Sequence, residues 1–530
     1  LLIAAATTTF VRNHICLRNP QSRLDYLFAD GSMVLGNAFL TASSIAQVLV
    51  DRRSGITIQH VELPVIWTAG FALLTLLSLR NLLRRPPTAK PGGTLLHASL
   101  CAPPFAGMAI ATGIYFLLKE GHPSGLAIYM QKLAEHALLY LQVGLYVWVG
   151  MILARTRLAA MAFDVLRPWR LPPEVLAALV VAFAAFPTAY SGASGIFVMA
   201  AGPLLFMEMR RAGARPQLAI ATTAMSGSLG VSISPCLLVV IIAAMNKELT
   251  TDQLYGWGWR VYALAAAGIL LAALIVRFRQ LKDIAPPKEA APVSGRNLAA
   301  LLPFVIIGAL VVCFYTFGLG TKVNEHTAPT VLPVLLILFL WWDTRSQRRT
   351  LPEDAPADVP RPRTGRLLVE ATAETSGHIG ALLMLMGCSM CFGGIIERSE
   401  VMSLVGNDLG SPIVAMAICV VLKVIIGMLM DPYGAVILVS VTLAPVAYRS
   451  GIDPVHFWAM VLVSFELGYL TPPIGLNTLL SRRIVEMTEP ELLLPQPGKS
   501  WLARHEGVLL NCTIMTVVLL CVAFLPFLWK

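Results

Sequence analysis

The chain has 530 residues, of which 56% are hydrophobic and only 13% are charged, and its mean hydropathy is +0.71. This composition excludes a soluble globular protein and predicts an all-α polytopic membrane protein with the phospholipid bilayer around it. The formal net charge of +10 does not indicate a nucleic-acid partner, because the basic residues collect in loops that are expected to face the cytoplasm.

Apolar segments that are candidate membrane spans recur along the whole chain and leave no room for a large soluble domain. The first of them opens the sequence at Leu1 and reads as the end of a helix already under way, so we expect that the natural N-terminus is missing. In chain order the expected spans are Leu1–Val11, Leu27–Val50, Leu63–Leu83, Leu95–Leu118, Leu133–Ala154, Gln217–Ala244, Val261–Val276, Leu301–Phe317, Val331–Trp342, Gly377–Ile396, Val455–Ser481 and Val508–Trp529.

Clusters of basic residues indicate how these spans thread through the membrane. All clusters can be cytoplasmic only if the segment Val175–Met209 enters the membrane and returns to the same side. It is therefore predicted to be a re-entrant hairpin, with its tip at Tyr190–Gly195 (YSGASG), where small residues permit the chain to reverse. The number of membrane crossings between the cytoplasmic clusters then makes Pro412–Tyr448 a second hairpin. It enters from the opposite side and has its tip at Asp431–Gly434 (DPYG).

An internal repeat supports these two hairpins. The stretch RAGARP, Arg211–Pro216, can be laid over RSGIDP, Arg449–Pro454, and matches continue downstream at the same offset. Each hairpin is followed by a helix that is interrupted, at GVSISP in the first half and at GYLTPP in the second. The sequence thus predicts inverted repeats over about residues 95–285 and 300–530, each with one re-entrant hairpin and one broken helix.

Broken helices expose carbonyl groups at one half-end and amide groups at the other, so they can bind a cation and an anionic group without full charges in lipid. Asp431 and Glu466 are the carboxylates nearest to the breaks, and an acid inside a membrane indicates function. Neutral oxygens suited to Na⁺ are supplied there by Ser191, Ser194, Ser232, Ser234, Thr471 and Asn477.

Purely structural roles remain open for all of these residues. Either acid can be a helix cap or a packed polar contact, and any hydroxyl can bond to a carbonyl of its own helix. Lys423 is expected to snorkel to an interface rather than to neutralise a substrate carboxylate. No HExxH, GxSxG or phosphate-binding loop occurs, so we expect no enzyme, no ATP hydrolysis and no organic cofactor, with Na⁺ as the only metal ion.

The second half of the chain resembles a known family. GMLMDPYGAVILVSVTLAPV, followed by GIDPVHFWAMVLVSFELGYLTPPIGLN, is similar to the signature of the large membrane subunit of tripartite ATP-independent periplasmic (TRAP) transporters. YSGASG with GSLGVSISPC resembles its counterpart in the first half, and the resemblance runs from about residue 95 to the C-terminus. Upstream, NHICLRN and the helix containing GFALL are similar to the family's small subunit, so residues 1–92 are predicted to be a truncated small subunit fused to a large one at 93–530.

The resemblance implies an inner-membrane, elevator-type importer that couples the uptake of an organic anion, often a carboxylate, to Na⁺. It implies delivery by a periplasmic substrate-binding protein, and we expect a monomeric membrane unit. One Na⁺ site is expected where Ser191, Gly192 and Ser194 meet Gly230, Ser232 and Ser234, and another where Asp431 and Gly434 meet Thr471 and Gly475. The substrate is expected between Ser191, Ser194, Pro432, Pro473 and Asn477.

Two other classes of function remain as alternatives. A stand-alone Na⁺/dicarboxylate symporter would need no binding protein and would carry a polar ligand motif at both hairpin tips, whereas the second tip here carries Asp431-Pro432. A channel or a membrane scaffold would account for the helices but not for paired breaks.

Overall fold

The computed structural model describes residues 1–530 except 13, 55–61, 85, 88, 136, 192–193, 235, 278–283, 322–326, 351–362, 400–409, 431, 490, 492–499 and 529–530. Within these residues the regular elements are helices. Ser22 and Lys90 also form a single isolated β-bridge. Seven of the described helices are long and apolar enough to cross a membrane. The expected all-α polytopic fold is therefore confirmed.

The chain divides into two compact units. The first contains Leu1–Leu141 and Ser376–Ile452, and the second contains Gln142–Thr375 and Asp453–Lys530. Two of the three division points fall within helices, α7 (Ala137–Ala154) and α16 (Thr364–Arg398), and the third follows Ile452, between two helices. The two units are defined by how the helices pack and do not correspond to the predicted subunits. The subunit boundary near residue 93 therefore remains a prediction.

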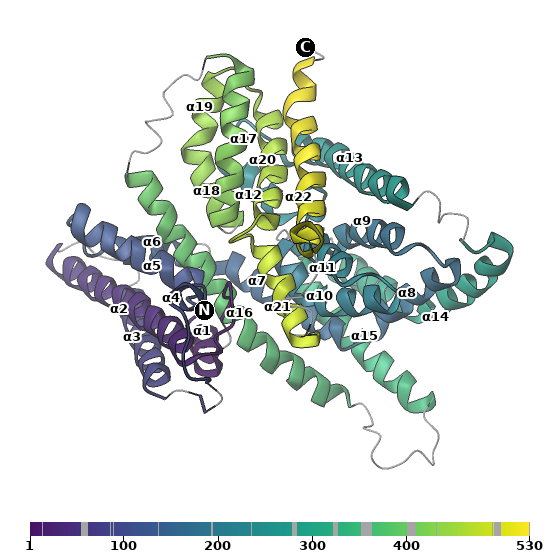
Figure 1. Ribbon diagram of the computed structural model, residues 1–530, viewed down its shortest axis with the longest axis horizontal. Coiled ribbons are helices and arrows are strands. Elements are labelled where there is room, and N and C mark those ends of the chain that lie inside the picture. The colour runs from purple at the N-terminus through teal and green to yellow at the C-terminus, as the bar shows by residue number, and fades with distance from the viewer. Residues whose placement is uncertain are drawn as a thin grey trace. The chain divides into compact units, whose positions relative to one another are not determined.

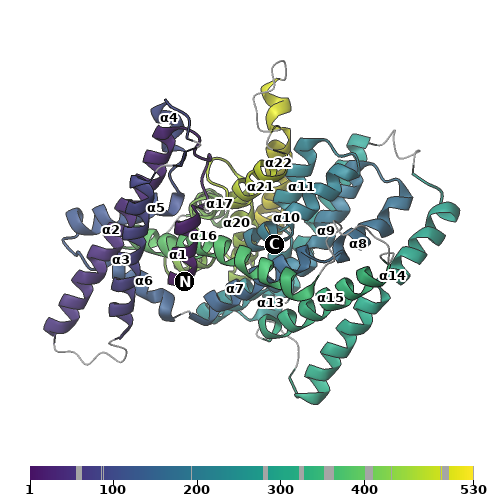
Figure 2. The ribbon, with the colours of Figure 1, turned by 90° about the horizontal axis from the view of Figure 1, so that it is seen from below.

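In the first unit, α2 (Arg23–Ser54) and α3 (Glu62–Leu83) pack side by side (Figures 1 and 2). Asn37 and Ser78 join them through a buried hydrogen bond of 3.0 Å. The remaining helices of this unit are α1 (Leu2–Val11), α4 (Leu95–Ser99), α5 (Pro104–Ile114), the π-helix η1 (Tyr115–Lys119), α6 (Gly125–Glu135), α17 (Pro412–Leu429), α18 (Pro432–Val441) and α19 (Leu443–Arg449).

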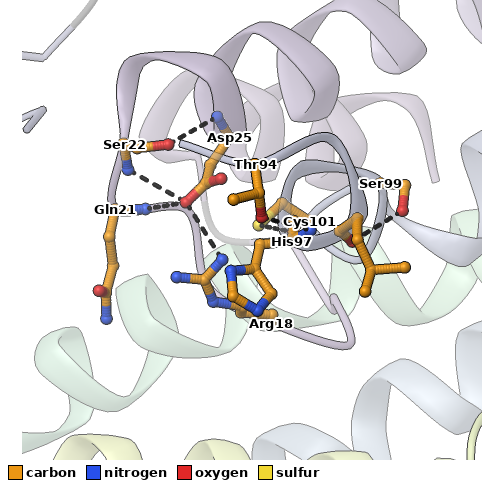
Figure 3. A network of polar contacts seen from close by, with 9 residues as sticks. Arg18, Gln21, Ser22, Asp25, Thr94, His97, Ser99 and Cys101 are labelled. Atoms are coloured by element: carbon orange, nitrogen blue, oxygen red, sulfur yellow. Dashed lines mark hydrogen bonds and ion pairs between the residues drawn. The ribbon is translucent and has the colours of Figure 1, made fainter. Parts of the chain in front are cut away.

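The segment that enters α2 lies beside α4 and the residues that follow α4 (Figure 3). Asp25, wholly buried, accepts hydrogen bonds from the backbone N–H groups of Gln21 and Ser22, both at 3.1 Å, and pairs with Arg18 at 3.6 Å. The backbone N–H of Arg18 donates to the Leu100 carbonyl at 3.1 Å, and the Cys101 thiol lies 3.3 Å from the His97 carbonyl. The predicted small-subunit part is thus fastened to the beginning of the predicted large subunit.

The second unit is built around α20 (Pro454–Leu470), whose residues from His456 to Leu470 are all buried. It packs against α22 (Trp501–Phe524) and α13 (Thr251–Arg277). The other elements of this unit are α8 (Leu158–Leu166), η2 (Arg167–Trp169), α9 (Pro173–Ser191), α10 (Ser194–Arg211), α11 (Pro216–Met225), η3 (Gly230–Ser232), α12 (Leu237–Met245), α14 (Pro287–Cys313), η5 (Phe314–Gly318), α15 (Ala328–Thr350), α21 (Leu476–Thr488) and η8 (Leu525–Leu528).

The internal repeat is visible in the backbone. At an offset of 238 residues, the end of α9 matches the end of α17, the start of α10 matches the start of α18, and α11 begins at the counterpart of the first residue of α20. Gly213 and Gly451, also 238 apart, have φ angles of 84° and 82°. Each donates its N–H over 3.0 Å to the carbonyl three residues earlier, at Arg210 and Tyr448. The two halves therefore share helix boundaries and one left-handed turn.

Both broken helices are present where the sequence predicts them. The first is interrupted between the end of α11 and the start of α12, with η3 in the gap, and the second between α20 and α21. The expected single span Leu95–Leu118 is wrong, because α4 ends at Ser99 and α5 begins again at Pro104. Pro103 and Pro104 end the earlier helix and start the next, since proline lacks the N–H that a helix interior needs.

Candidate functional site

Four segments of the second unit converge at the tip of the first hairpin. Ser194 begins α10, Ser228 lies in the turn after α11, Glu466 is in α20 and Asn477 is in the first turn of α21. All four side chains are buried, none more than 3% exposed. The Ser194 hydroxyl donates to Asn477 Oδ1 at 3.4 Å, and the hydroxyls of Ser194 and Ser228 face the carboxyl group of Glu466.

Glycine makes this close approach possible. A Cβ atom at Gly227 would lie 2.4 Å from the Ser194 carbonyl oxygen, and one at Gly195 would lie 2.8 Å from the Leu476 side chain. A Cβ atom at Gly230 would lie 2.4 Å from the Ala185 carbonyl oxygen of α9. The first broken helix therefore meets the hairpin tip and α9 backbone against backbone, which only glycine permits there, and the tip lies tight against the Leu476 side chain of the second broken helix.

The cluster contains polar atoms without partners. Within the part of the chain that the structure describes, Ser228 Oγ, Glu466 Oε2 and Asn477 Nδ2 are buried and make no hydrogen bond of good geometry, although the hydroxyls of Ser194 and Ser228 lie close enough to the Glu466 carboxyl group to stabilise its charge. Buried polar atoms are nearly always satisfied, so three such atoms in one place are suited to a partner from outside the chain, such as an ion, a ligand or a water. A cavity of about 10 Å³ is lined by Ser228, Ser232 and Glu466 among other residues, about the space that one water needs.

The cluster has groups that can bind a cation and groups that can bind an anion. The carboxyl group of Glu466 and the serine hydroxyls offer oxygen atoms to a cation, which is the ligand type that Na⁺ takes. Asn477 and Ser194 lie in the first turns of α21 and α10, where helix dipoles and free N–H groups favour an anionic group. Asn477 Nδ2 adds a further donor.

The other expected ligands of the first Na⁺ site have mixed surroundings. Ser232 is buried and donates its hydroxyl to the Leu229 carbonyl at 3.1 Å, whereas Ser234 is exposed. The donated proton leaves the lone pairs of Ser232 available to a cation. Gly192 lies outside the described residues, and of Ser191 the structure describes only the backbone at the end of α9.

The residues of the expected second Na⁺ site are divided between the two units. Gly434 and Pro432 are buried in α18 of the first unit, while Asp431 lies outside the described residues. Thr471 and Gly475 belong to the second unit, where the Thr471 hydroxyl donates to the Leu467 carbonyl at 2.6 Å. Pro473, expected at the substrate, is exposed. This second site therefore remains a prediction.

Two residues differ from what their sequence context indicated. Lys423 is wholly buried, so the expectation that it snorkels is wrong: it shares the buried face of α17 with Cys419 and Ile426. Ser228 was not among the expected ligands, although it lies 238 residues before Glu466 and so is its counterpart in the repeat. The repeat is recognised by identical residues, so a position with serine in one half and glutamate in the other does not stand out.

The family match and the named curated relatives point to the same family. The family described as "Tripartite ATP-independent periplasmic transporter, DctM component" matches residues 95–528. The chain is 25% identical over 309 residues to the C4-dicarboxylate TRAP transporter large permease protein DctM of Pseudomonas aeruginosa, which covers 56% of this chain and 66% of that protein. It is 22% identical over 306 residues to the sialic acid TRAP transporter large permease protein SiaM of Vibrio cholerae, with the same two shares.

The chain thus spans just under two thirds of the length of each of these two relatives, 66%. A solved structure, described as the crystal structure of the Alcanivorax borkumensis YdaH transporter with an unusual topology, is 15% identical. The match covers 79% of this chain and 89% of that one, with a TM-score of 0.43.

Proposed function

Because the chain belongs to the DctM component family of the TRAP transporters, we propose that it imports an organic anion, expected to be a carboxylate, together with Na⁺. The family consists of integral inner-membrane permeases and not of enzymes. Both relatives named above carry the names of organic acids, a C4-dicarboxylate and sialic acid, which supports the substrate class. A periplasmic substrate-binding protein delivers the anion, in keeping with the family's description.

The observation that carries the proposal is the set of orphan polar atoms at Ser228, Glu466 and Asn477. In our proposal Na⁺ binds beside Glu466, with the hydroxyls of Ser194, Ser228 and Ser232 as neutral ligands. A bound cation would supply the partner that Glu466 Oε2 lacks, and the negative carboxyl group would offset the cost of desolvating the ion.

The substrate anion binds next to the cation, at the first turns of α10 and α21. Asn477 Nδ2 donates to it, and the helix dipoles favour its charge. Since cation and anion neutralise one another at one site, each raises the affinity for the other, and this reciprocity is what couples their transport. The two hairpins and broken helices then carry both past the remaining helices in an elevator motion.

Residues 1–94 lie outside the family match, and we propose that they are a small subunit fused to the large one. A stand-alone Na⁺/dicarboxylate symporter is the runner-up. The proposed importer requires a periplasmic binding protein, whereas the stand-alone symporter does not.

Uptake into proteoliposomes tests the proposal. The purified chain is reconstituted with an inward Na⁺ gradient, and labelled C4-dicarboxylate or sialic acid is supplied free or loaded on a periplasmic binding protein. We expect uptake only with both the Na⁺ gradient and the binding protein. Full uptake of free substrate would favour the stand-alone symporter, uptake that ignores Na⁺ would overturn the coupling, and single-channel current would indicate a channel.

A further inference from the structure

A second cavity in the second unit lies away from the cluster of Ser194, Ser228, Glu466 and Asn477. It has a volume of about 100 Å³ and is lined by α9, α11, α13 and α22. Its wall is apolar, because the two polar side chains within it are already satisfied: Asn511 donates to the Ala221 carbonyl and Thr222 to the Leu218 carbonyl, each at 2.8 Å. We call this cavity the slot.

The slot is long and narrow. Its lining follows α11 from Arg215 to Met225 and α22 from Glu506 to Ile514, and at 1.5 Å per residue these stretches are about 12–15 Å long. On both helices the charged residue comes first and the apolar residues follow. The slot therefore has one charged end and an apolar interior, like a site for one hydrocarbon chain with a polar head.

The charged end holds one guanidinium between two carboxylates. Arg215 Nη2 lies 2.9 Å from Glu506 Oε1 and 3.5 Å from Glu174 Oε1, and Arg215 Nη1 donates to Glu506 Oε2 at 3.2 Å. The side chains of Arg215 and Glu506 are 51% and 42% exposed, whereas that of Glu174 is 8% exposed. This end is thus open to a ligand and carries one negative charge in excess.

We propose that the slot binds phosphatidylethanolamine, with one acyl chain between the four helices and the headgroup at the charged end. The phosphate of this lipid meets the exposed Arg215, and its primary ammonium group donates hydrogen bonds to Glu506 and Glu174. The headgroup brings one negative and one positive charge, which complements a guanidinium flanked by two acids.

This arrangement discriminates between headgroups. Phosphatidylcholine has no N–H to donate to the carboxylates, so it binds less tightly. Phosphatidylglycerol has no cationic group at all and meets the excess negative charge, so it binds least. The proposal is independent of the transport function, because the binding requires neither Na⁺ nor a periplasmic protein.

Native mass spectrometry of the purified full chain tests the proposal, with the three lipids added at equal concentration and with identical acyl chains. We expect phosphatidylethanolamine to be retained about tenfold more than phosphatidylglycerol, the difference expected for one hydrogen bond to a charged group. Glu506→Gln, at a half-exposed position, should remove most of this preference. Ala272→Leu fills the slot and should lower the retention of all three lipids, while Ala267→Leu, exposed on the same helix, should leave it unchanged.

Equal retention of the three headgroups by the wild type would overturn the proposal, and so would equal losses in Ala272→Leu and Ala267→Leu. Glu506→Gln decides the matter if Ala272→Leu fails to fold, because a preference that survives this change also overturns the assignment of the headgroup.

Discussion

Ser228 and Glu466 face each other although they are 238 residues apart, and they are counterparts in the internal repeat. Ser228 is 3% exposed and Glu466 is 2% exposed. One half of a repeated fold thus supplies a neutral hydroxyl where the other half supplies an acid. In the proposed function, a cation bound between them would take its counter-charge from one half alone.

Glu466→Gln should abolish the coupling to Na⁺. The amide brings an N–H₂ group and no charge to the point where Glu466 Oε2 lacks a partner, so the initial rate of Na⁺-driven uptake should fall about 100-fold, or about 2.7 kcal/mol. Glu289→Gln, in the exposed first turn of α14, is the matched control and should transport normally. An unchanged Na⁺ dependence in Glu466→Gln would remove this residue from the cation site.

Ser194→Ala should weaken Na⁺ binding without abolishing transport. The change removes a hydroxyl that faces both Glu466 and Asn477, and it should raise the Na⁺ concentration at half-maximal uptake about 5- to 20-fold, or about 1–2 kcal/mol. Ser99→Ala, at an exposed position of α4, should leave that concentration unchanged. A loss of uptake at saturating Na⁺ with normal Na⁺ affinity would instead indicate a role in folding or in substrate binding.

Gly213→Ala and Gly451→Ala should each lower the free energy of unfolding by about 1–2 kcal/mol, because alanine tolerates a positive φ poorly. A Cβ atom at Gly213 would meet nothing within 4 Å, so backbone strain is the whole effect there. Gly295→Ala, also in open space but inside α14, should change stability in the opposite direction by about 0.5–1 kcal/mol. The midpoints of denaturant unfolding compare the three variants, and equal signs for all three would contradict the argument.

Asp343→Asn should destabilise the second unit by about 2–3 kcal/mol. Asp343 is buried in α15 and accepts from the backbone N–H and Nε of Arg157, at 3.0 and 2.9 Å, and from Gln347 at 2.8 Å. An asparagine would turn an N–H₂ group toward these donors. Asp164→Asn breaks the exposed pair with Arg167 and should cost less than about 0.5 kcal/mol. Similar unfolding midpoints for the two variants would show that the Asp343 network adds no stability.

Sequence periodicity and turn chemistry predicted the fold best where the apolar signal is local. The spans expected at 27–50 and 63–83 lie within α2 and α3, and the breaks expected at GVSISP and GYLTPP fall between α11 and α12 and between α20 and α21. Helix ends were harder to predict. The helices α14 and α16 begin at Pro287 and Thr364, 13 or more residues before the spans expected from Leu301 and Gly377, since hydropathy marks only the apolar part of a helix.

The site was predicted in part. The sequence singled out Ser194, Glu466 and Asn477, and the structure brings these three together. Ser228 was not predicted, because it is a single serine in an apolar stretch. Only the tertiary fold brings it next to the carboxyl group of Glu466. Burial of Lys423 was likewise invisible, since the sequence does not say which face of α17 is covered.

The left-handed turns at Gly213 and Gly451 stand at equivalent points of the two halves, and residues other than glycine adopt such an angle only at a cost. The turns fix the register in which one half corresponds to the other. In that register the halves differ in charge at Ser228 against Glu466 and at Ala185 against Lys423, so a pseudo-symmetric backbone carries an asymmetric set of ionisable groups.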